Sequence, residues 1–79
     1  NGEVDLILER PGELIFCEVK TRSSQRYGHP VEAVTPMKAR KVRQLAAVWM
    51  AHHPGGGRTV RFDVAGVIGG EVIVAPSAF

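Results

Sequence analysis

The stretch Leu14-Ile15-Phe16-Cys17-Glu18-Val19-Lys20 decides the fold, because it is apolar at nearly every position until its end. A strand with one solvated face alternates apolar and polar residues, whereas a continuous apolar run is typical of a strand that is buried on both faces. Residues 14–20 therefore predict a central strand of a sheet.

The residues before this strand predict its hairpin partner. Residues 3–9 have the spacing of a strand, and Arg10-Pro11-Gly12-Glu13 is a turn signal, because proline fixes φ and glycine tolerates positive φ. A two-residue turn at 11–12 would oppose Asp5 to Glu18 on one face of the hairpin. A three-residue loop would shift the pairing by one and oppose Asp5 to an apolar neighbour of Glu18.

The residues after the central strand predict one helix and two further strands. Thr35 is a good N-cap and Pro36 suits the first helical position, while Pro54-Gly55-Gly56-Gly57 ends the helix. Strands follow at 58–68 and 71–75. The side chains with the spacing of a buried helical stripe are Val42, Leu45, Ala46 and Trp49.

The order ββαββ predicts an α/β domain with a mixed sheet and one main helix. All 79 residues fit a single domain. One helix covers only one face of a sheet, so the central strand lacks a cover on the other. Because the chain also begins at Asn1 without a methionine, we expect a domain truncated at its N-terminus or completed by a partner subunit, such as a homodimer mate.

Composition excludes several classes of protein. No apolar run approaches the roughly 18 residues of a membrane-spanning helix, so we expect no membrane association. Cys17 is the single cysteine, which rules out an internal disulfide and the cysteine-rich zinc patterns. A reducing, cytoplasmic location is the simplest expectation.

Positive charge is concentrated in one part of the chain. Residues 20–43 contain seven basic side chains and one acidic one, whereas the rest of the sequence contains three basic and seven acidic residues. A basic surface beside an acidic one suits a protein that binds a polyanion with one face. The alternative is a solvated helix whose lysines and arginines provide solubility.

The hairpin register brings Asp5, Glu18 and Lys20 to one face at the open end of the hairpin. Paired carboxylates repel each other unless a cation lies between them, and hard divalent ions such as Mg²⁺ or Mn²⁺ favour oxygen ligands. Such a site, with a lysine nearby, could activate a water molecule for phosphodiester hydrolysis. The alternative is a surface cluster in which Lys20 pairs with one of the acids.

Several blocks of sequence resemble the YraN-like family of small bacterial proteins, which are described as predicted endonucleases distantly related to archaeal Holliday-junction resolvases. The blocks are Gly2-Glu3-Val4-Asp5-Leu6-Ile7, Glu18-Val19-Lys20-Thr21-Arg22, residues 27–34, Lys38 with Arg40, and Arg61-Phe62-Asp63-Val64. The resemblance implies a restriction-endonuclease-like core with a PD-(D/E)xK site. It implies that Asp5, Glu18 and the Val19 carbonyl bind the metal, and that Lys20 is the catalytic lysine. The family's N-terminal helix, which carries a further acidic residue, is absent from this sequence.

The basic residues next to this site predict nucleic-acid contacts. Arg22 and Arg26 follow the site directly, and Lys38 and Arg40 begin the helix near the same loop. We therefore expect a Mg²⁺- or Mn²⁺-dependent DNA endonuclease, by analogy with resolvases one that acts on branched DNA. The alternatives are a nucleic-acid-binding or protein-interaction module without hydrolysis, and a structural oligomerisation domain.

Four other residues are expected to be structural. Cys17 points away from Glu18 and is interpreted as a core residue, and Asp63 shares a face with Arg61 and answers its charge. His52 and His53 end the helix, where imidazolium suits the dipole better than the pair suits a zinc site.

Overall fold

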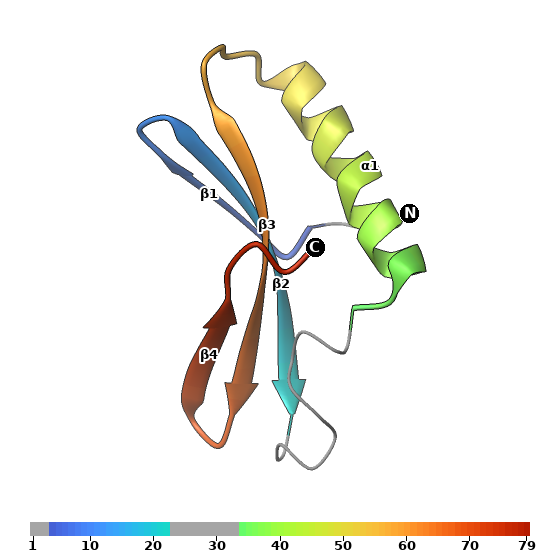
Figure 1. Ribbon diagram of the computed structural model, residues 1–79, viewed down its shortest axis with the longest axis vertical. Coiled ribbons are helices and arrows are strands. Elements are labelled where there is room, and N and C mark those ends of the chain that lie inside the picture. The colour runs from blue at the N-terminus through green and yellow to red at the C-terminus, as the bar shows by residue number, and fades with distance from the viewer. Residues whose placement is uncertain (1–3, 23–33) are drawn as a thin grey trace.

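A four-stranded mixed sheet carries one helix within the described part of the chain (Figure 1). The computed structural model describes residues 4–22 and 34–79, with Arg22 described by its backbone alone. The elements are β1 (Leu6–Arg10), β2 (Glu13–Arg22), α1 (Pro36–His52), β3 (Thr59–Ile68) and β4 (Glu71–Ala75). Strands β2 and β3 run parallel, while β1 and β4 pair antiparallel at the two edges. The predicted α/β architecture with a mixed sheet is confirmed.

The predicted register of the hairpin is also confirmed. Leu6 lies opposite Cys17 and Arg10 opposite Glu13, so the turn consists of Pro11 and Gly12. Gly12 has φ of +77°, the conformation that a type II turn requires after proline.

Five strand boundaries differ from the prediction, two of them by more than one residue. β1 begins at Leu6, and Val4 and Asp5 lie outside the strand. A longer β1 would use the Val19 N–H in its ladder, but here that group donates to the Asp5 side chain. β2 extends to Arg22, two residues beyond the predicted strand 14–20, because β3 pairs with it along its whole length.

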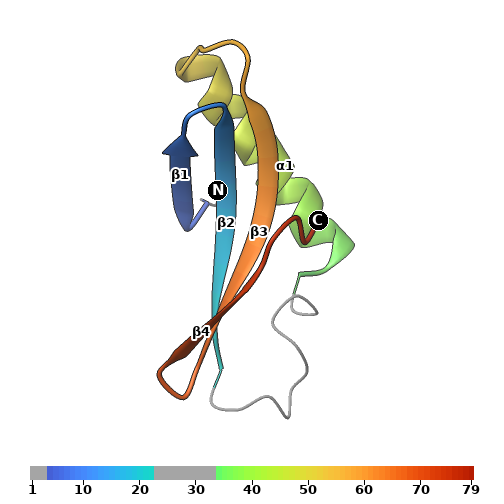
Figure 2. The same cartoon turned by 60° about the vertical axis from the view of Figure 1, so that its left-hand side comes forward.

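The core lies between α1 and one face of the sheet (Figure 2). Phe16 of β2 stacks on Phe62 of β3 and meets the edge of Trp49 from the helix. Val42 and Ala46 of the predicted helical stripe are fully enclosed. Leu45 and Trp49 are only half-buried, because they line an open apolar pocket beside Ile7 of the short strand β1.

The helix covers only this face of the sheet. On the opposite face Ile15 and Cys17 are nevertheless buried, between the side chains of β1 and β3. The other apolar side chains there are partly in solvent: Leu6, Leu8, Val19, Val72 and Val74.

Local interactions explain where α1 begins. The Thr35 hydroxyl accepts a hydrogen bond from the Lys38 N–H at 3.1 Å, and Pro36 occupies the first turn, as the sequence predicts. At the other end, the His52 and His53 rings both contact carbonyls of the last turn through Nδ1. The histidines thus satisfy the helix terminus, in agreement with their predicted structural role.

Candidate metal centre beside the helix N-terminus

Asp5 is anchored across the open end of the hairpin. Its Oδ2 accepts a hydrogen bond from the Val19 N–H at 2.9 Å. This bond is the main reason why the pKa of Asp5 lies below its ordinary value; burial works against it, and Glu18, Lys20 and Lys38 lower it further. Asp5 is therefore an exposed carboxylate that stays ionised and is held in place by main chain.

Glu18 has the opposite environment, because it is buried on the helix side of the sheet with 2% of its surface exposed. Its position in β2 places it on the same face as Phe16, directly over the core. A buried carboxylate needs compensating charge or hydrogen bonds, since desolvation of an unpaired ion costs several kcal/mol (about 3–5 when one partner is removed).

The compensating charge comes from Lys38 in the first turn of α1. Its Nζ lies 2.9 Å from Glu18 Oε2, and 44% of the lysine side chain remains exposed. Glu18 raises the pKa of the Lys38 ammonium through this short contact and its charge, while partial burial lowers it.

One oxygen of Glu18 depends on a single partner. The Lys38 ammonium lies 2.9 Å from Oε2, a charge-assisted contact, and the described part of the chain offers this oxygen no other donor. A carboxylate oxygen can accept more than one hydrogen bond. Oε2 therefore has room for a second partner on the side of the polar cluster.

Lys20 completes the cluster. It lies two residues after Glu18 on the same face of β2, is partly buried, and acts electrostatically on both Asp5 and Lys38. The structure thus brings together the three residues that the sequence predicts, Asp5, Glu18 and Lys20, and adds Lys38 to them.

The sequence predicts that Lys38 binds nucleic acid and does not predict its contact with Glu18. One property of the helix sequence could have indicated that contact. Lys38 is a cation in the first turn, where the helix dipole favours an acid, and that turn contains no acidic residue. A charge placed against the local preference indicates a tertiary partner.

Of the other predicted binding residues, Arg40 has a described side chain, and it is exposed on α1. Arg26 and the Arg22 side chain lie outside the described residues, so their predicted phosphate contacts stay predictions. The predicted metal contact of the Val19 carbonyl also stays a prediction. The Val19 N–H donates a hydrogen bond to Asp5.

The described part of the cluster contains two carboxylates, Asp5 and Glu18. Among residues 4–22 and 34–79, no group of three or more His, Cys, Asp or Glu side chains is arranged to hold a metal ion. A divalent ion with few protein ligands completes its shell with waters and substrate phosphate, which is the usual habit of Mg²⁺.

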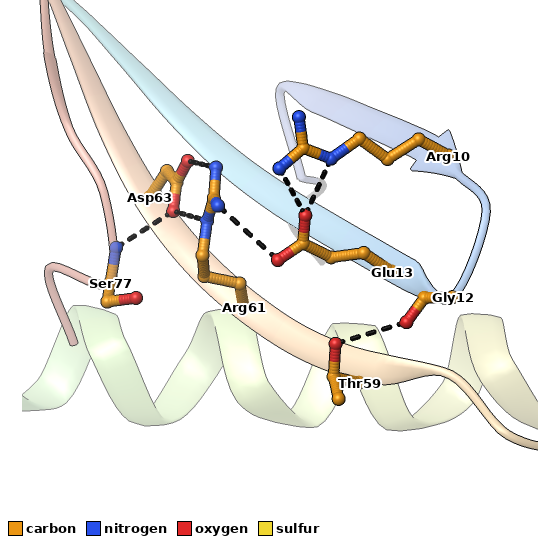
Figure 3. A network of polar contacts seen from close by, with 7 residues as sticks. All are labelled: Arg10, Gly12, Glu13, Thr59, Arg61, Asp63 and Ser77. Carbon is orange, nitrogen blue, oxygen red and sulfur yellow. Dashed lines mark hydrogen bonds and ion pairs between the residues drawn. The ribbon is translucent and has the colours of Figure 1, made fainter.

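A second charged cluster lies on the opposite face of the sheet (Figure 3). Arg61 binds Asp63 through two parallel hydrogen bonds of 2.8 and 2.9 Å and also reaches Glu13, which pairs with Arg10. The Ser77 N–H donates to Asp63 at 2.9 Å. These contacts join the hairpin, β3 and the C-terminal segment, as expected of a structural charge pair.

Asp63 is nearly fully buried, and its pKa is nevertheless lowered. Burial alone would raise the pKa of Asp63, but the hydrogen bonds from Arg61 and Ser77 outweigh it. Its neighbour in register, Cys17, is buried as predicted, and burial followed by the Asp63 charge raises the pKa of this thiol. A thiol of raised pKa is a poor nucleophile.

Fold and cluster together define an α/β domain that presents two carboxylates and two lysines at the junction of a hairpin and a helix N-terminus. The model of the uncharacterised protein family UPF0102 matches residues 1–67. The chain belongs to this family, which confirms the resemblance to the YraN-like proteins.

Bacterial relatives carry the same family name. A UPF0102 protein of Frankia alni is 54% identical over 63 residues, which cover 80% of this chain and 52% of the relative. A UPF0102 protein of Beutenbergia cavernae is 50% identical over 68 residues, 86% of this chain and 58% of the relative. The chain thus spans about half the length of the curated relatives it matches.

Hydropathy adds one finding. Within the described ranges, α1 falls short of the length and apolar character that a bilayer-crossing helix requires.

Proposed function

We propose that this chain carries the catalytic centre of a metal-dependent nuclease that hydrolyses phosphodiester bonds in DNA, within a restriction-endonuclease-like core. The observation that carries the proposal is the buried Glu18, whose Oε2 has the Lys38 ammonium as its single described partner, beside the ionised Asp5. The order of hairpin, helix and parallel strand is compatible with that core. Branched DNA is the substrate suggested by the resemblance to resolvases.

The residues of the cluster fit a hard divalent cation such as Mg²⁺ or Mn²⁺. Asp5 and Glu18 supply carboxylate oxygens, one of them already fixed by main chain and the other partly unsatisfied. Bound there, with the Val19 carbonyl as the third proposed ligand, the ion would supply Lewis-acid chemistry and lower the pKa of a water molecule.

The protein's own groups have separate roles in this proposal. The Val19 N–H holds Asp5 in a fixed orientation, which spares the site the cost of ordering that side chain. Lys20 lies on the same face and provides positive charge where the phosphate would gain negative charge. Arg40 and Lys38, with Arg22 and Arg26, would hold the DNA backbone.

The test is a cleavage assay on branched and linear DNA in Mg²⁺ and in Mn²⁺. Asp5→Asn, Glu18→Gln and Lys20→Ala should each lower the cleavage rate at least about a hundredfold, as removal of a catalytic group or metal ligand usually does. Lys41→Ala is the matched control, because Lys41 is an exposed lysine of α1 outside the cluster. It should cleave at the wild-type rate.

DNA binding separates this proposal from a non-catalytic binding module. In the nuclease, Lys20→Ala retains DNA binding and loses cleavage, and affinity falls steeply as salt is raised. DNA binding without cleavage by the wild-type protein in either metal would favour the binding module. A DNA affinity that does not change with salt would show that the basic residues do not bind the phosphate backbone.

A further inference from the structure

Lys38 lies where the local physics of the helix disfavours it. It is the third residue of α1, its N–H is capped by the Thr35 hydroxyl, and its side chain carries positive charge at the positive end of the helix dipole. An acidic residue at this position would strengthen the helix. The compensation is the contact of 2.9 Å between Lys38 Nζ and Glu18 Oε2.

The contact is also asymmetric. Glu18 is enclosed at 2% exposure, so its carboxylate stays in place, whereas the Lys38 side chain is 44% exposed and sits on a long flexible stem. When the ammonium moves away from Glu18, the lysine returns to water at small cost and the carboxylate loses its compensating charge. An incoming cation would then neutralise the negative charge of Glu18.

The number of partners supports the same conclusion. The Lys38 ammonium, 2.9 Å away, is the single described group that contacts Oε2. Arg61, in contrast, fixes the buried Asp63 with two parallel hydrogen bonds. Lys38 thus compensates the charge of Glu18 through one contact of its ammonium, which is more easily exchanged than a bidentate pair.

We propose that the Lys38 ammonium is an exchangeable counter-ion of Glu18, which stabilises the cation-free protein and must leave Oε2 before a divalent cation binds there. The inference rests on the proposed function for the identity of the site. It adds a regulation that the function does not require: Lys38 sets how much free Mg²⁺ or Mn²⁺ is needed to fill the centre, and once displaced it is free to contact a phosphate.

The test compares Lys38→Met with Lys41→Met, which removes an exposed lysine from the next turn of the same helix. Mn²⁺ affinity is measured by isothermal titration calorimetry, and Tm by thermal unfolding in chelator and in saturating Mn²⁺. Lys38→Met should bind Mn²⁺ about tenfold more tightly than wild type, because the competing charge is gone. Lys41→Met should bind as wild type does.

The Tm of Lys38→Met should also depend on whether Mn²⁺ is bound. In chelator, Lys38→Met should melt more than about 8 °C below wild type, because it leaves the buried Glu18 carboxylate without its compensating charge. In saturating Mn²⁺ that deficit should shrink, because the cation replaces the missing ammonium. A deficit of the same size under both conditions would contradict the exchange.

A second variant keeps the inference testable where Lys38→Met does not fold. Lys38→Arg retains the charge and can form two parallel hydrogen bonds with a carboxylate, so it should bind Mn²⁺ no more tightly than wild type. Tighter binding by Lys38→Arg, or unchanged or weaker binding by Lys38→Met, would overturn the role of Lys38 as a competing counter-ion.

The two proposals fail in different ways. If wild type binds Mn²⁺, Glu18→Gln abolishes that binding and Lys38→Met leaves it unchanged, the counter-ion inference is wrong and the metal centre remains. If wild type, Lys38→Met and Lys41→Met all bind no Mn²⁺ at millimolar concentrations, the metal centre is wrong and the inference that rests on it is wrong too.

Discussion

Each face of the sheet carries a charged cluster with a buried acid, and the two acids differ in how their charge is compensated. Asp63 on one face has every partner it needs, from Arg61 and from the Ser77 main chain. Glu18 on the other face has one flexible lysine at contact distance, and no second described group donates to the same oxygen. Both acids are almost fully buried.

The difference distinguishes a charge that holds the fold together from one that is available for chemistry. A fully hydrogen-bonded network is rigid and leaves no capacity for a ligand. A buried carboxylate with partial compensation costs stability, and proteins retain such costs mainly at functional sites. This contrast predicts that equivalent substitutions in the two clusters have different consequences.

The largest expected effect on stability comes from Asp63→Leu. It would leave the Ser77 N–H and the half-buried Arg61 guanidinium without their acceptor, and we expect a loss of about 2–4 kcal/mol of unfolding free energy. Urea denaturation measures it, with the exposed Glu71→Leu as the control. A loss no greater than that of the control would show that the Arg61 network is not structural.

The matched substitution Glu18→Leu should give the contrasting result. Leucine would fill apolar surroundings on the core side of the sheet and remove a partly compensated charge, so we expect stability within about 1 kcal/mol of wild type, or above it. The same variant should lose cation binding and cleavage. Destabilisation equal to that of Asp63→Leu would remove the distinction between the clusters.

Acid unfolding tests how much Asp63 and Asp5 each contribute to stability. The pKa values of Asp63 and Asp5 are both lowered from the ordinary value of 3.8, so at low pH the unfolded chain takes up protons before the folded one. The stability that these acids provide is present above about pH 3.8 and is lost as pH falls through their folded pKa values.

Asp63→Asn should flatten this acid dependence more than Asp5→Asn, because Asp63 is buried and Asp5 is exposed. Unfolding curves recorded between about pH 5 and pH 2 provide the comparison, with slopes interpreted by proton linkage. An acid dependence that both variants leave as steep as wild type would place the responsible carboxylates elsewhere.

The smallest expected effect on stability is that of Lys20→Ala. The side chain contributes positive charge at a partly exposed position, and its removal should change the unfolding free energy by less than about 0.5 kcal/mol. Cleavage should nevertheless be lost. A variant that cleaves DNA at the wild-type rate would remove Lys20 from the catalytic machinery.

Much of this arrangement could be predicted from the sequence, because it follows from local patterns. The turn at Pro11-Gly12 sets the hairpin register, and that register brings Asp5, which directly precedes β1, close to Glu18. Thr35 and Pro36 define where the helix begins. Each of these features depends on residues within a few positions of one another.

The features that the sequence reasoning missed depend on how distant segments pack. The contact between Lys38 and Glu18 requires the position of α1 on the sheet, which the helical pattern alone does not determine. The length of β2 depended on its pairing with β3.

The most direct test of the central claim is a calorimetric titration with Mn²⁺ of wild type, Glu18→Gln and Glu13→Gln. Glu13 belongs to the Arg61 network on the opposite face, so its variant is the matched control. The account predicts saturable binding to wild type and to Glu13→Gln, and none to Glu18→Gln. Equal binding by all three proteins, or none by wild type, would contradict it.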